Sequence, residues 1–118
     1  MAIVRINVPE IIGTTDCVAT ADGQKVHDVI ASNLREGNVV HVSFQGVKSI
    51  ITAFLNAAIG QLYGEFKDEE LSGKIVLIEA KKDDVAKVIK VVSGAKLYFK
   101  DKKKFDTAQQ DALGTDGE

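Results

Sequence analysis

The sequence predicts a single α/β domain, because segments with the two-residue periodicity of strands alternate with segments of helical periodicity. The chain of 118 residues is long enough for one hydrophobic core. Its 45% hydrophobic and 27% charged residues are typical of a globular protein. The predicted order is a strand, a short second strand and three successive helix–strand pairs, with no internal repeat.

Two strands are predicted near the N-terminus. Residues 2–8 alternate between two faces and are rich in β-branched side chains, which favours a strand. Pro9, the only proline, ends this strand because it has no backbone N–H to donate. A second, short strand is predicted near residues 17–20.

The first predicted helix covers residues 24–36. It is followed by Gly37 as a stop signal and by a predicted strand over residues 39–44, in which apolar residues alternate. The apolar residues of the helix recur at the spacing of one helical face, namely Val26, Val29, Ile30 and Leu34.

The most informative part of the chain follows. A polar loop around Gly46 leads into a predicted helix over residues 52–66 that is apolar on nearly all sides. Such a helix is either central and buried or presents one face to a partner. Gly60 in its middle costs about 1 kcal/mol relative to Ala, so we expect close packing there.

The C-terminal part is predicted to complete the domain at residue 101. The expected elements are an acidic loop over residues 67–73, a strand over 74–80, a helix over 83–92 that Gly94 stops, and a last strand over 95–99. Residues 102–118 are polar and lack periodicity, which predicts a flexible tail.

Charge and cysteine content exclude several classes of function. The net charge of −2 gives no general attraction to nucleic acid or membranes, although nine of the fifteen basic residues lie between Lys81 and Lys104. We interpret that segment as a solvated helix face or a basic docking surface. Nucleic-acid binding is not favoured, because few aromatic residues accompany the lysines.

Cys17 is alone, so no internal disulfide can form, and no apolar run approaches the roughly 20 residues of a membrane span. We therefore predict a cytoplasmic protein that does not enter the membrane.

Motifs for catalysis are missing from the sequence. It contains neither a GxxxxGK[ST] phosphate loop nor a GxGxxG dinucleotide motif. His27 and His41 are the only histidines, and no carboxylates cluster at metal-ligand spacing. We therefore predict no enzyme activity, no cofactor and no metal site.

The start of the 52–66 helix is the remaining candidate site. The unpaired N–H groups and partial positive charge of a helix N-terminus can hold an anion or a phosphorylated hydroxyl. Thr52 is expected either to act only as the N-cap or also to be modified or contacted by a partner. Ser49 lies in the preceding loop.

The stretch GNVVHVSFQGVKSIITAFLNAAIGQLYGEF resembles the STAS-like domains, relatives of the sulfate transporter and anti-sigma factor antagonist domains. Its FLNAAIGQL part is the most specific, and the flanking ADGQKVHDVIASNL and VIKVVSGAKLYFKD are also similar. The resemblance extends over residues 3–101. It implies a STAS-like fold with a four- or five-stranded mixed sheet and helices packed mainly on one side.

The resemblance also suggests a phosphorylation site. Bacterial-type anti-sigma factor antagonists carry a Ser in this loop that a kinase-like partner phosphorylates, and Thr52 lies at the matching position. Ile51 replaces a frequent Thr, and Ser43 replaces a frequent Asp. These two replacements remove a hydroxyl and a carboxylate close to the expected switch.

The leading functional hypothesis is a regulatory protein-interaction module without enzyme activity. Its partner would be a histidine-kinase-like ATPase or an anti-sigma factor. The expected partner-binding or phosphoacceptor residues are Thr52, Ser49, Phe54, Leu55 and Asn56. The alternative is a domain that senses a small anion or nucleotide at the same helix start. A homodimer through an uncovered side of the 54–66 helix remains open.

Overall fold

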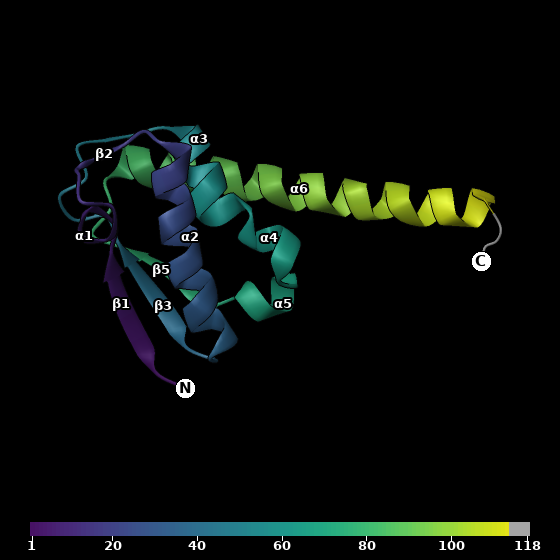
Figure 1. Cartoon of the computed structure of the whole chain (residues 1–118), viewed down its shortest axis with the longest axis horizontal. Helices are drawn as coiled ribbons and strands as arrows, with labels where there is room; N and C mark the ends of the chain where they lie inside the picture. Colours follow the sequence, from purple (N-terminus) through teal and green to yellow (C-terminus); the bar gives the residue numbers. More distant parts are fainter. Residues whose placement is uncertain (114–118) are drawn as a thin grey trace.

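The computed structural model describes the backbone of residues 1–113 and the side chains of residues 1–100. Helices and strands alternate along the chain, and the long α6 extends away from the rest of the domain (Figure 1). The elements are β1 (Ile3–Asn7), α1 (Val8–Ile12), β2 (Asp16–Cys17), α2 (Thr20–Arg35), β3 (Val39–Ser43), β4 (Ser49–Ile50), α3 (Thr52–Leu55), the π-helix η1 (Asn56–Gly60), α4 (Leu62–Glu65), α5 (Asp68–Leu71), β5 (Ile75–Ile78) and α6 (Lys82–Leu113).

The strands form two small sheets instead of one mixed sheet. β1, β3 and β5 form a three-stranded sheet with β3 in the centre, and β2 pairs with β4. Every described pair is parallel. The predicted mixed sheet is therefore wrong, whereas the α/β class is confirmed. The physical reason is the connections, because a helical crossover returns the chain to the same end of the sheet and produces parallel pairing.

The hydrophobic core lies on one face of the three-stranded sheet. Ile6, Val40 and Val42 are at most 8% exposed and belong to the core. Their neighbours in sequence point to the opposite face, because strand side chains alternate. Arg5 on that face is exposed, and His41 is half-buried. The alternation expected for residues 2–8 and 39–44 thus separates a covered face from an open one.

The predicted 52–66 helix is present, but it is interrupted by a π-turn. The N–H of Gln61 donates to the carbonyl of Asn56 at 3.1 Å, five residues earlier. Gly60 is buried, and a Cβ there would make an ordinary van der Waals contact with Val91 of α6, at 3.5 Å. At Gly23 of α2, a Cβ would lie 2.6 Å from the carbonyl oxygen of Phe54, so α2 is pressed against this segment.

The C-terminal prediction is wrong in one respect. Gly94 does not stop the last helix, and the segment predicted as a strand over residues 95–99 lies inside α6. Burial explains this outcome, because Val88, Val91 and Ala95 continue the helical spacing and are all buried. That packing outweighs the cost of about 1 kcal/mol for a glycine within a helix.

The predicted tail over residues 102–118 begins within α6, whose backbone is described to Leu113. Residues 114–118 lie outside the described residues. The predicted acidic loop over residues 67–73 contains the short helix α5. The short strand predicted near residues 17–20 corresponds to β2 and begins slightly earlier.

Candidate functional site at the start of the 52–66 helical segment

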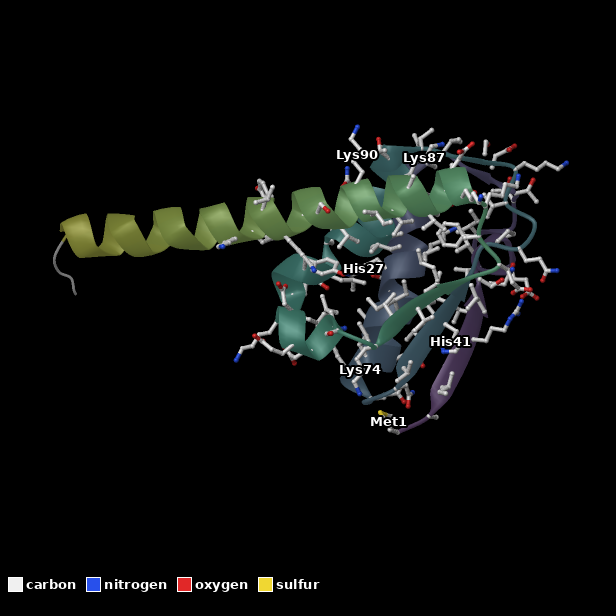
Figure 2. The ribbon with its side chains drawn as sticks, turned by 180° about the vertical axis from the view of Figure 1, so that it is seen from behind. Met1, His27, His41, Lys74, Lys87 and Lys90 are labelled. Atoms are coloured by element: carbon white, nitrogen blue, oxygen red, sulfur yellow. The ribbon has the colours of Figure 1, made fainter. Side chains whose placement is uncertain are left out.

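The connection between β4 and α3 is held by hydrogen bonds with two other elements. The N–H of Ile51 donates to the carbonyl of Cys17 at 3.1 Å, which continues the pairing of β2 with β4. From α6, Nζ of Lys87 donates to the carbonyl of Ile50 at 2.9 Å. Figure 2 shows Lys87 and Lys90 on the first part of α6. The start of α3 is therefore fixed between β2 and α6.

Thr52 is exposed and is the first residue of α3. The N-cap is Ile51, with an extended backbone and no capping side-chain hydrogen bond. The expectation that Thr52 is the N-cap is wrong, because the chain enters helical geometry one residue after Ile51. A residue already inside the helix does not have the extended conformation with which an N-cap side chain reaches back to the first-turn amides.

Ser49 and Asn56 are both exposed, but their surroundings differ. Oγ of Ser49 donates to a carboxylate oxygen of Asp16 at 2.9 Å, across the β2–β4 pair. Asn56 begins the π-turn one helical turn beyond Thr52. The structure therefore brings Ser49, Thr52 and Asn56 to one region, with Ser49 already engaged by a neighbouring carboxylate.

Phe54 and Leu55 belong to the hydrophobic core instead of the surface. Each is 1% exposed. Their expected role as contact residues for a partner is therefore wrong for the folded domain, since a partner cannot reach side chains that are enclosed by the core. The sequence pattern was ambiguous here, because a helix that is apolar all round has no marked outer face.

Two exposed apolar side chains at this site were not identified from the sequence. Val18 follows β2 and is 51% exposed, and Ile51 precedes α3 and is 42% exposed. The parallel pairing of β2 with β4 places the two strand ends side by side. Sequence patterns could not reveal that Val18 and Ile51 are neighbours. Each of the two strands has only two residues, and β2 and β4 lie far apart in the chain.

The electrostatic environment of this region is acidic. Burial, together with the nearby carboxylates of Asp84, Asp16 and Asp22, raises the pKa of the Cys17 thiol to about 11. Negative charges favour the neutral thiol over the thiolate. The same carboxylates disfavour an anion in this region, whereas the Lys87 ammonium, which donates to the carbonyl of Ile50, favours one.

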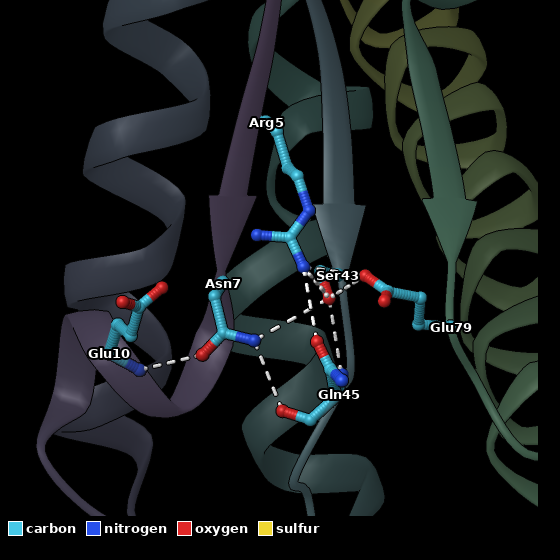
Figure 3. Close-up of polar contacts among 6 residues, drawn as sticks. All are labelled: Arg5, Asn7, Glu10, Ser43, Gln45 and Glu79. Atoms are coloured by element: carbon cyan, nitrogen blue, oxygen red, sulfur yellow. Dashed lines mark hydrogen bonds and ion pairs between the residues drawn. The ribbon is translucent and has the colours of Figure 1, made fainter.

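A second polar cluster lies at the carboxyl ends of β1, β3 and β5 (Figure 3). Its centre is the fully buried Ser43, whose Oγ donates to Oε1 of Glu79 at 2.6 Å. Oγ of Ser43 also accepts hydrogen bonds from the Arg5 guanidinium and from the backbone N–H of Gln45, each at 3.2 Å. Arg5 also forms an ion pair with Glu79 at 2.6 Å. The cluster therefore joins all three strands.

The backbone of Glu79 is unusual. Its φ of 54° is in the left-handed region, which residues other than glycine adopt at an energetic cost. The hydrogen bond from Ser43, and then the one from Arg5, lower the pKa of the Glu79 carboxyl. Sequence reasoning singled out Ser43 but not Arg5 or Glu79, because contacts between three separate strands cannot be deduced from local patterns.

His27 forms a third group of polar contacts between α2 and α4. It is 5% exposed, with Nε2 at 2.7 Å from Glu65 and Nδ1 at 2.9 Å from Asp28. Gln24 also approaches Nδ1, at 3.1 Å. These partners satisfy a buried ring whose polar atoms would otherwise be costly to bury. The network links the helical segment at residues 52–66 to α2.

Other kinds of site are not found in the described part of the chain. Among its side chains, no group of three or more His, Cys, Asp or Glu residues could hold a metal ion. Within the same part, no helix combines the length and apolar character needed to cross a membrane.

The comparisons with known proteins identify a family. Residues 22–85 match the family described as STAS-like domain of unknown function (DUF4325), which is more than half of the chain. This segment runs from α2 to the first turn of α6 and includes the start of α3. No curated protein and no solved structure matches the chain. The resemblance found in the sequence is thereby confirmed, and the chain belongs to the STAS-like domain family.

Proposed function

We propose that this domain is a regulatory module without enzyme activity that binds a protein partner through the surface around Thr52. We call this the Thr52 surface and define it as Val18, Ser49, Ile51, Thr52 and Asn56. The observation that carries the proposal is the exposed position of Thr52 at a helix start, beside the exposed apolar side chains of Val18 and Ile51. A hydroxyl next to accessible apolar groups suits a docking site that a modification can control.

Phosphorylation of Thr52 would act on this surface through charge. A phosphate adds about two negative charges at pH 7. It would stand at a helix start, which favours negative charge, but near carboxylates that already raise the pKa of Cys17. The added charge would also make docking on Val18 and Ile51 less favourable. We propose a histidine-kinase-like ATPase or an anti-sigma factor as the partner, which rests on the family resemblance.

The alternative function, sensing of a small anion or nucleotide, has less support. Asp16 and Asp84 lie near the same helix start, and their charge opposes a free anion. Partner binding requires no such anion and fits the exposed apolar groups better.

The proposal can be tested by combining phosphosite mapping with binding measurements. The intact mass and phosphopeptides of the protein from its own cells would show whether Thr52 carries phosphate. Binding of purified kinase-like ATPases and anti-sigma factors from the same genome would then be compared for wild type and Thr52→Glu. We expect Thr52→Glu to weaken binding at least about tenfold, since negative charge would face an apolar docking surface.

The matched control is Ser32→Glu, which adds the same charge at an exposed position near the C-terminal end of α2. It should leave binding unchanged. Equal binding of wild type, Thr52→Glu and Ser32→Glu to every partner that binds would remove the Thr52 surface from consideration. Failure of every candidate to bind any form would reject the proposed partner class.

A further inference from the structure

No described helix or strand lies over the face of the three-stranded sheet that points away from the core, and only side chains of the polar cluster around Ser43 cover part of it. We call it the open face, and its members alternate with the core residues along β1, β3 and β5. Ile3 is 68% exposed and Val76 is 37% exposed. The open face consists of Ile3, Arg5, Asn7, Val39, His41, Ser43, Val76 and Ile78.

An uncovered face is unusual for a sheet of this type. Sheets in which all strands are parallel occur almost only with both faces buried. Here the core residues Ile6, Val40 and Val42 occupy the other face, together with the partly buried Leu77. In Figure 3 the helices lie behind the strands, while the polar side chains of the open face stand in front. A single copy of the chain therefore leaves exposed the kind of surface that α/β proteins normally bury.

The charges on the open face are arranged so that two copies of this face are complementary in charge. Arg5 extends from the edge strand β1, and Glu79 follows the opposite edge strand β5. Their charged groups meet over Ser43, at the carboxyl end of the central strand β3. The side chains of Arg5 and Glu79 remain 48% and 41% exposed. Each can therefore meet a second charge above the sheet.

A two-fold axis that lies along β3 in the plane of contact would exploit this arrangement. Rotation about such an axis keeps the strand direction and exchanges the two edges, so β1 of one copy lies over β5 of the other. Arg5 then faces Glu79 of the partner subunit, and Glu79 faces Arg5 of the partner subunit. The exposed Ile3 on β1 then lies over β5 of the other copy, the strand that carries Val76 of the partner subunit. Every opposed charge pair is of opposite sign.

We propose that a second copy of this chain covers the open face, in a symmetric dimer whose two-fold axis runs along β3. Isologous contacts of this kind are the commonest form of homodimer. The interface would contain Ile3 and Val39 beside Lys74 toward the amino ends of the strands, and it would carry a four-charge cluster toward their carboxyl ends. The inference is independent of the Thr52 surface, which consists of other residues on other elements.

The test uses two charge reversals, Arg5→Glu and Glu79→Arg, and the mass of the purified full chain by light scattering and sedimentation equilibrium. Each variant alone would place like charges opposite each other, so we expect its dimer dissociation constant to rise by at least about 100-fold. Mixing the two variants in equal amounts should restore dimers, because both pairs across the axis become opposite in sign. An ion pair used only within one subunit cannot be restored by mixing.

Two further variants keep the test independent of folding. Arg5→Glu and Glu79→Arg both lose the intramolecular ion pair at 2.6 Å, so circular dichroism and thermal melting must show that each is folded. Ile3→Glu changes a side chain that is 68% exposed, and it should abolish the dimer without unfolding the domain. Lys25→Glu, an exposed reversal on α2, is the control and should leave the dimer intact.

The expected result is a wild-type dimer, weakened variants and a restored mixture. A folded wild type that stays monomeric at all concentrations would overturn the proposal. A dimer that persists in Ile3→Glu and in both charge variants would also overturn it, since the contact would then lie elsewhere, such as on α6 or on the 54–66 segment. Weakened variants without recovery on mixing would reject the proposed axis.

Discussion

Thr52 and Ser43 both carry a hydroxyl close to the carboxyl end of a parallel strand, yet their environments are opposite. Thr52 is exposed and has no role in capping α3. Ser43 is fully buried, and its Oγ has four polar neighbours, from Arg5, Asn7, Gln45 and Glu79. The difference separates two environments: Ser43 joins the strands, whereas the Thr52 side chain remains exposed at the surface.

The comparison extends to the groups around each hydroxyl. Ser43 lies in a cluster in which one cation, Arg5, balances one anion, Glu79, at 2.6 Å. The region of Thr52 contains the carboxylates of Asp16 and Asp84, with Lys87 directed to a backbone carbonyl. The Ser43 hydroxyl thus lies within a closed set of polar contacts, whereas the Thr52 side chain is exposed.

The largest expected effect distinguishes the core of the 52–66 segment from its surface. Phe54→Ala should lower the free energy of unfolding by about 3–5 kcal/mol, because it leaves a cavity where a side chain is only 1% exposed. Thr52→Ala should change it by no more than about 0.5 kcal/mol. Chemical denaturation of both variants measures the contrast. Similar losses for the two would mean that Thr52 has a structural role after all.

A smaller effect is expected for the two serines. Ser43→Ala should lower the free energy of unfolding by about 1–3 kcal/mol, since it removes a buried hydroxyl that satisfies several polar groups. Ser49→Ala, whose exposed hydroxyl contacts only Asp16 among the described side chains, should cost about 0.5 kcal/mol or less. Urea titrations at neutral pH test this order. A reversed order would contradict the interpretation of Ser43 as the centre of the cluster.

The smallest effect concerns pH. The hydrogen bond from Ser43 and the contact with Arg5 lower the pKa of Glu79 below its ordinary value of 4.5. The unfolded chain therefore binds a proton at this group more readily than the folded chain does as pH falls. The stabilisation is present above pH 4.5 and is lost as pH falls through the lowered pKa.

Glu79→Gln removes this titration and is the direct comparison. Below pH 4.5, the free energy of unfolding should decline less steeply for Glu79→Gln than for wild type. Denaturation at a series of pH values measures the two slopes. Parallel curves would show that Glu79 is not stabilised in its charged form by Ser43 and Arg5.

Part of the candidate site could be predicted from the sequence. The polar loop followed by the apolar run at residues 52–66 indicated a helix start near Thr52, and FLNAAIGQL indicated the family. Burial of Phe54 and Leu55 could not be predicted, because an all-apolar helix does not reveal which side is covered. Val18 and Asp16 were missed because the β2–β4 pairing joins segments about 30 residues apart.

The sequence by itself determined the α/β class, the positions of most helices and strands, and the family, because these follow from local periodicity and from a specific motif. The tertiary structure decided the division into two parallel sheets, the continuation of α6 through Gly94 and the cluster of Arg5, Ser43 and Glu79. Each of these depends on contacts between distant segments. Burial against η1 and α4 outweighs a local glycine signal, and strand order depends on which crossover packs best.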